Sequence, residues 1–79
     1  MKNIQVYSTH SCPWCVRAKA LLQSKGLDYE EINISSDPER TLEMVQRSGR
    51  RTVPQIFIDD ESIGGFDELS ALNKKGQLD

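Results

Sequence analysis

Two cysteines stand close together near the beginning of the chain, in the stretch SCPWCVRAK, and the 79 residues contain no third. They are Cys12 and Cys15, separated by Pro13 and Trp14. Thiols at this spacing either exchange electrons, as dithiol and disulfide, or supply two ligands to a metal ion. A disulfide between them would close too short a loop to restrict the unfolded chain, so a purely structural bridge would add little stability.

Metal binding is the weaker interpretation of this pair. Structural zinc takes four Cys or His ligands, and the sequence offers only His10 beside the two cysteines. Covalent haem attachment requires a histidine directly after the second cysteine, where Val16 stands. Two buried, inert cysteines are a further alternative. The local sequence favours redox chemistry, and no metal ligand is predicted.

The residues around the pair predict a strand that ends just before it and a helix that begins with it. NIQVYS alternates apolar and polar residues, and PWCVRAKALLQSK places a proline at the first helical position before good helix formers. Cys12 would then face the unpaired N–H groups and the positive end of the helix, which favour a thiolate nucleophile. Three basic side chains are predicted to add positive potential: His10, Arg17 and Lys19.

Cys15 lies one turn further along the helix predicted over residues 13–25. It shares a face with Ala18 and Leu22, so its side chain is predicted to point inward. A thiol there is further from the helix end and stays protonated, which suits it to attack second and release a mixed disulfide. Pro13 fixes the backbone between the two thiols and donates no N–H group.

The rest of the chain continues the alternation of strands and helices. A strand is predicted over residues 28–34, followed by a helix that starts at Asp37 and Pro38 and stops at Gly49. That helix has Leu42 and Val45 as its apolar pair, with Met44 beside them. Two strands over residues 54–59 and 62–64 come next, and then a helix over residues 66–75 with Leu69 and Leu72 buried. The order βαβαββα predicts one α/β domain, residues 1–79, in which helices flank a four-stranded mixed sheet. Such a sheet places ligand chemistry at the carboxyl end of its first strand, where the cysteines lie.

Composition excludes several classes of protein. The formal net charge is −2, and the pair Arg50 and Arg51 is too small a basic patch for nucleic acid. No apolar run approaches the roughly 18 residues that cross a membrane, and the ends MKNIQVYS and GQLD carry no secretory or lipidation signal. We therefore expect a cytoplasmic monomer that binds neither nucleic acid nor membrane.

Four features together resemble the glutaredoxins: CPWC after the first strand, TVPQIFI at Thr52 to Ile58, IGGFDEL at Ile63 to Leu69, and the spacing between them. The resemblance covers essentially the whole chain. It implies a thioredoxin-like fold and a glutathione-dependent oxidoreductase that reduces protein disulfides and glutathionylated proteins. Cys12 would be the nucleophile and Cys15 the resolving thiol, with glutathione as the reducing co-substrate and no bound cofactor.

The resemblance also implies a glutathione site. A cis proline at Pro54 would face the cysteines, and the Val53 main chain would bond to the peptide. The full predicted set is Trp14, Arg50, Arg51, Thr52, Val53, Pro54, Gly65, Phe66 and Asp67, with the arginines at the glycyl carboxylate and the last three residues at the glutamyl end. Several have a simpler interpretation: Pro54 as the start of an edge strand, the segment from Gly65 to Asp67 as a turn and helix cap, the two arginines as a solvated basic pair, and Trp14 as a core residue.

Two positions depart from the family pattern. Many glutaredoxins have Lys where this chain has Thr9, so either glutathione binds more weakly or the neighbouring His10 substitutes when protonated. Trp14 stands where Tyr is common and keeps an aromatic wall at the rim of the site. Two alternative functions stay open. One is an electron donor that thioredoxin reductase reduces. The other is an iron–sulfur carrier, in which two protomers and two glutathiones hold one cluster through Cys12.

Overall fold

Seven elements follow one another in the predicted order βαβαββα. The computed structural model describes residues 3–78, so residues 1–2 and 79 of the predicted domain lie outside the described part. The elements are β1 (Ile4–Ser8), α1 (Pro13–Ser24), β2 (Glu30–Asn33), α2 (Pro38–Ser48), β3 (Gln55–Ile58), β4 (Glu61–Gly64) and α3 (Phe66–Lys74). Their ends differ from the predicted ones by one or two residues, because flanking residues such as Lys25 and Lys75 cap the helices and do not extend them.

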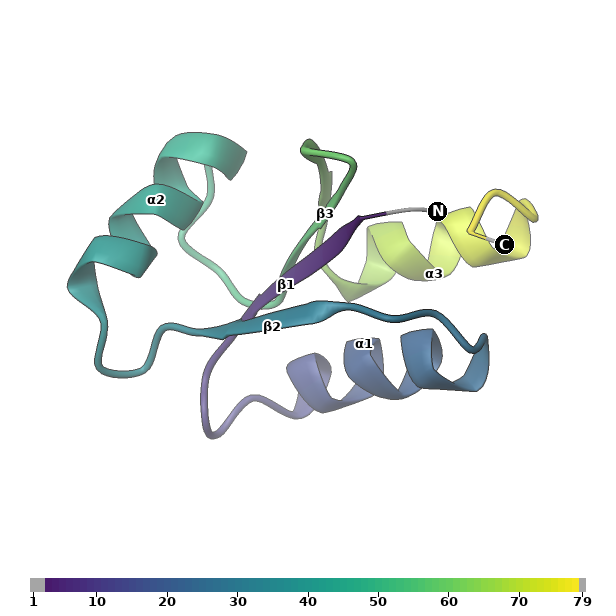
Figure 1. The fold of residues 1–79 in the computed structure, drawn as a ribbon, viewed down its shortest axis with the longest axis horizontal. Helices are drawn as coiled ribbons and strands as arrows, with labels where there is room; N and C mark the ends of the chain where they lie inside the picture. The colour runs from purple at the N-terminus through teal and green to yellow at the C-terminus, as the bar shows by residue number, and fades with distance from the viewer. Residues whose placement is uncertain (1–2, 79) are drawn as a thin grey trace.

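The strands form one mixed sheet in the order β2-β1-β3-β4. β1 runs parallel to β2 and antiparallel to β3, and β4 is antiparallel to β3. In Figure 1, α1 and α3 lie side by side on one face of the sheet, and α2 lies on the other. The predicted four-stranded mixed sheet flanked by helices is therefore confirmed.

Two apolar clusters hold these layers together. Between the sheet and the pair α1 and α3 lie Ile4, Val6, Ala18, Leu22, Ile56, Leu69 and Leu78, and between the sheet and α2 lie Tyr7, Ile32, Ile34, Met44 and Phe57. Neighbouring strand residues point to opposite faces, so β1 gives Val6 to the first cluster and Tyr7 to the second. β1 is thereby fixed from both sides, and the loop that follows it carries Cys12.

The three apolar residues predicted for α2 lie in different environments, and Val45 packs against the cluster under the helix. Leu42 is 57% exposed, whereas Met44 is fully buried. The hydroxyl group of Tyr7 donates to Glu43 and accepts from Arg47, which orients the helix so that Met44 meets the sheet and Leu42 faces solvent. In α3, Leu69 is fully buried as predicted, but its predicted partner Leu72 is only half buried.

None of the helices formed by residues 3–78 combines the length and apolar character that a membrane crossing requires.

Candidate active site

Cys12 is the N-cap residue of α1, with φ −113° and ψ 104°. Its sulfur accepts a hydrogen bond from the backbone N–H of Cys15 at 3.1 Å, so it takes the place that a Ser or Asp oxygen usually occupies at a helix start. Pro13 is the first helical residue, where its missing N–H group costs nothing. The free N–H groups and the positive end of the helix therefore face the sulfur and stabilise negative charge on it.

Cys15 has the opposite environment. Its side chain is fully buried on the face that α1 turns to the sheet, together with Ala18 and Leu22, as the spacing predicts. Burial, and then the hydrogen bond with the Cys12 sulfur, raise the pKa of the Cys15 thiol to about 12, although a backbone hydrogen bond with Thr9 opposes them. Both cysteines are free, and Cys15 is a neutral thiol near neutral pH.

The loop before β3 lies directly against Cys12. The peptide bond between Val53 and Pro54 is cis, the geometry that the resemblance implies. The Cys12 sulfur is 3.6 Å from the carbonyl oxygen of Val53, to which the thiol donates. Behind this turn, buried Gln55 donates through Nε2 to the hydroxyl oxygen of Thr52 at 3.0 Å, which ties the loop to the start of β3.

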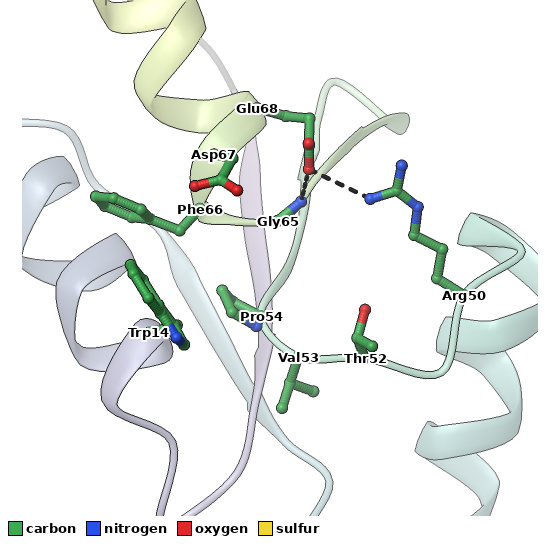
Figure 2. A pocket seen from close by; sticks show the side chains of 9 residues that line it. All are labelled: Trp14, Arg50, Thr52, Val53, Pro54, Gly65, Phe66, Asp67 and Glu68. Carbon is green, nitrogen blue, oxygen red and sulfur yellow. Dashed lines mark hydrogen bonds and ion pairs between the residues drawn. The ribbon is translucent and has the colours of Figure 1, made fainter.

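A pocket of about 250 Å³ opens next to this turn. Its lining residues come from α1, the loop between α2 and β3, and the start of α3: Trp14, Arg50, Thr52, Val53, Pro54, Gly65, Phe66, Asp67 and Glu68. Figure 2 shows Trp14 and Phe66 on one side of the pocket, Arg50 on the other, and the Thr52 to Pro54 segment between them. The structure thus brings together eight of the nine residues predicted to bind glutathione, and Arg51 is the one that does not line the pocket.

Trp14 forms an aromatic wall at the rim. It is 49% exposed, which agrees with the predicted position at the edge of the site. The guanidinium of Arg17 lies 4.5 Å from the centre of the Trp14 ring, and the ring of Phe66 lies 5.7 Å away at an angle of 39°. These two contacts hold an otherwise exposed indole in place.

Glu68 is a pocket residue that the sequence interpretation missed. Its carboxylate accepts from the backbone N–H of Gly65 at 2.6 Å and pairs with Arg50 at 3.2 Å, as the dashed lines in Figure 2 show. The Gly65 N–H group and then Arg50 hold the pKa of Glu68 below its usual range. The signal was present, because a glutamate three residues after an N-cap residue is half of a capping box.

Comparison with known proteins decides the family. The glutaredoxin family model matches residues 4–63. Over 79 residues the chain is 52% identical to Glutaredoxin 3 of Escherichia coli K12, covering 100% of this chain and 95% of the relative. The chain belongs to the glutaredoxin family. It is a glutathione-dependent thiol–disulfide oxidoreductase.

Solved structures support the same assignment for this glutaredoxin. Glutaredoxin 1 from Francisella tularensis, complexed with cacodylate, superimposes with a TM-score of 0.84 at 32% identity, covering 100% of both chains. A buckwheat glutaredoxin–glutathione complex superimposes with a TM-score of 0.88 at 30% identity, covering 98% of this chain and 73% of the other. The predicted thioredoxin-like fold is confirmed.

The three basic residues near the cysteines of this glutaredoxin contact different parts of the protein. His10 is exposed, and its backbone N–H and its ring contact Ser35 and Asn33 on the side of β2. Arg17 covers Trp14. Lys19 turns toward Glu31 of β2. Within residues 3–78, no group of three or more His, Cys, Asp or Glu side chains is arranged to hold a metal ion.

Proposed function

We propose that Cys12 carries out the first attack on the disulfide and that Cys15 resolves the product. The observation that supports this most directly is the pair of environments just described. The Cys12 sulfur is only half buried, lies at the N-terminus of α1 and adjoins the pocket, whereas Cys15 is fully buried and neutral. A thiolate is the attacking form in thiol–disulfide exchange, so the sulfur that the helix end favours reacts first.

Glutathione is the proposed occupant of the pocket. The peptide would lie along Thr52, Val53 and Pro54, with its cysteine beside Cys12. Its glutamyl end would meet Gly65, Phe66 and Asp67 at the start of α3, where N–H groups favour a carboxylate and the Asp67 carboxylate suits the amino group. Trp14 would cover the peptide from one side. Arg50 would bind the glycyl carboxylate, with Arg51 adding positive charge outside the lining.

Two routes follow from this arrangement. The Cys12 thiolate attacks a mixed disulfide, a bond forms between Cys12 and the glutathione sulfur, and the protein thiol leaves. In the monothiol route a second glutathione thiolate attacks that bond, which releases glutathione disulfide and restores Cys12. In the dithiol route Cys12 first joins a protein disulfide and Cys15 displaces the protein thiol, which leaves a Cys12–Cys15 disulfide for two glutathiones to reduce.

The proposed partners are glutathione and proteins that carry disulfides or glutathionylated cysteines. We propose that the single domain of residues 1–79 acts as a monomer in the cytoplasm, where glutathione keeps thiols reduced. A formal net charge of −2 gives it no electrostatic attraction to nucleic acid or to anionic lipid surfaces.

The test is turnover of a glutathione mixed disulfide, coupled to glutathione reductase and NADPH, by the wild type and two variants. Cys12→Ser is expected to abolish turnover, and Cys15→Ser to retain it because glutathione replaces the resolving thiol. Loss of all activity in Cys15→Ser would contradict the division of roles. If the wild type is active with thioredoxin reductase but not with glutathione, thioredoxin reductase and not glutathione is its reductant.

A further inference from the structure

Behind Cys15, on the side away from the pocket, lies an ion pair that the proposed reaction does not use. The ammonium of Lys19 and the hydroxyl of Ser8 both donate to Oε2 of Glu31, each at 2.8 Å. Ser8 ends β1 and is fully buried. The Lys19 side chain is 22% exposed and the Glu31 side chain 37% exposed, so both are partly shielded from solvent. The three groups form one hydrogen-bonded cluster between α1, β1 and β2.

The geometry directs this cluster to the buried thiol. Lys19 follows Cys15 by four residues in α1, so the two side chains lie one above the other on the same face. Glu31 is in register with Val6, whose side chain packs under α1, so it projects to the same face of the sheet. The spacing therefore places the Lys19 side chain one helical turn from Cys15, with the Glu31 carboxylate bound to its ammonium.

Other titratable groups also lie near this cluster. Besides the Cys12 sulfur, the loop before α1 contributes His10, which contacts Asn33, and the segment before β2 contributes Tyr29, whose hydroxyl accepts from Gln23. The two acidic residues of α3, Asp67 and Glu68, line the pocket in front of Cys12. Burial is the largest cause that raises the pKa of Cys15, and the charge of Lys19 opposes it as a smaller cause; the hydrogen bond with Glu31 raises the pKa of Lys19.

We propose that Lys19 is a positioning residue for the resolving step: it stabilises the Cys15 thiolate, Glu31 moderates that effect, and together they set the balance between the dithiol and monothiol routes. The inference rests on the proposed role of Cys15. In the step concerned, Cys15 gives its proton to water and its thiolate attacks Cys12 in the mixed disulfide. The Cys12–Cys15 bond forms, the bond to the bound thiol breaks, and that thiol leaves as a thiolate that takes a proton from water.

The opposite charges of the two partners make the inference testable. Lys19→Met removes the positive charge beside Cys15 and is expected to slow closure of the Cys12–Cys15 disulfide roughly three- to tenfold near neutral pH, the size expected for one charge a helical turn away in a partly hydrated site. Glu31→Gln removes the negative charge and is expected to speed closure by roughly two- to fivefold. Lys19→Arg keeps the charge and should restore a rate close to that of the wild type.

Closure is followed by rapid mixing of reduced protein with a glutathione mixed disulfide, with the fluorescence of Trp14, the only tryptophan, as the signal. Lys74→Met, at the end of α3 away from the pocket, is the matched control for loss of one lysine. As a second measurement, each substitution is combined with Cys12→Ser, and the rate at which iodoacetamide alkylates Cys15 is compared below about pH 9, where Lys19 still carries its charge.

The pattern of signs separates electrostatics from packing. If the ion pair only fastens α1 to β2, Lys19→Met and Glu31→Gln will change closure in the same direction, which would overturn the inference. An unchanged closure rate and an unchanged rate of Cys15 alkylation in Lys19→Met would overturn it as well. If the wild type forms no Cys12–Cys15 disulfide at all, the proposed role of Cys15 fails, and the inference fails with it.

Discussion

The two sulfur atoms of the CPWC motif have different surroundings, because Cys12 caps α1 and Cys15 lies inside it. The Cys12 sulfur accepts an N–H group at the open end of α1 and adjoins the pocket. The Cys15 sulfur is fully buried one turn later, and its pKa is about 12. In the proposed mechanism, these positions give identical side chains different roles and set the order of attack.

The raised pKa of Cys15 predicts a pH-dependent resolving step. The thiol is neutral well below a pH of about 12, so its thiolate fraction rises with pH. When glutathione occupies Cys12, the hydrogen bond with the Cys12 thiol is altered, but burial, the largest cause, remains. We expect the closure rate to rise roughly tenfold per pH unit between about pH 6 and 8. Rapid mixing at a series of pH values measures it, and a flat profile would show that ionisation of Cys15 does not limit closure.

Adjacent arginines provide a matched test of the pocket. Arg50 lines it and pairs with Glu68, whereas Arg51 does not line it. Arg50→Gln is expected to raise the KM for glutathione roughly three- to tenfold, as loss of one charge-assisted contact at a half-exposed site would. Arg51→Gln should change it less than about twofold. Steady-state kinetics with varied glutathione decide this, and equal effects of the two substitutions would contradict the assignment of the glycyl carboxylate to Arg50.

Most of the residues that line the pocket could be named from the sequence, on two different grounds. The surroundings of the two sulfurs followed from the CPWC motif at a helix start, whereas the TVP and GGFD segments were assigned through the resemblance to glutaredoxins. Glu68 was missed because its role depends on a contact made across a turn and on Arg50, which is 18 residues away. Arg51 lies outside the lining, which the sequence could not show because it does not reveal which of two neighbouring arginines points to the pocket.

At the scale of elements, the turn from β4 into α3 shapes one wall of the pocket. Gly64 has a φ of +119°, and a Cβ atom added there would lie 2.5 Å from Oε1 of Glu68. That oxygen is already held by Gly65 and Arg50. The glycine therefore permits both the backbone conformation and the close approach of the Glu68 carboxylate.

Gly64→Ala is expected to destabilise the protein by about 1–3 kcal/mol, because it combines backbone strain with displacement of the Glu68 cap. Gly49→Ala is the control: Gly49 ends α2 with a φ of +75°, but nothing lies within 4 Å of its added Cβ. It should cost about 1 kcal/mol, from strain alone. Urea unfolding of both variants measures the difference, and an equal cost would show that Glu68 moves aside freely.

The whole molecule is a sheet with different partners on its two faces. α1 and α3 meet on one face and build the pocket where both helices begin, while α2 covers the other face (Figure 1). The order of elements predicted this layering. The orientation of α2 could not be predicted, because Leu42 and Met44 are both apolar and contacts between distant residues, such as those of Tyr7 with Glu43 and Arg47, help to fix which one faces the sheet.

This orientation predicts unequal effects of two similar substitutions. Met44→Ala removes a fully buried side chain from the cluster under α2 and is expected to reduce the free energy of unfolding by about 2–5 kcal/mol. Leu42→Ala changes an exposed side chain and should alter it by less than about 0.5 kcal/mol. Thermal or urea unfolding compares them directly. A large loss in Leu42→Ala would mean that α2 packs with its other face.

The identity of the attacking sulfur is tested most directly by intact-mass analysis after brief exposure of each single-cysteine variant to glutathione disulfide. The account predicts one glutathione on Cys12 in Cys15→Ser, formed rapidly near neutral pH, and almost none on the buried Cys15 in Cys12→Ser. An adduct that forms faster on Cys15, or none on Cys12, would contradict the central claim that the helix-capping sulfur at the pocket is the nucleophile.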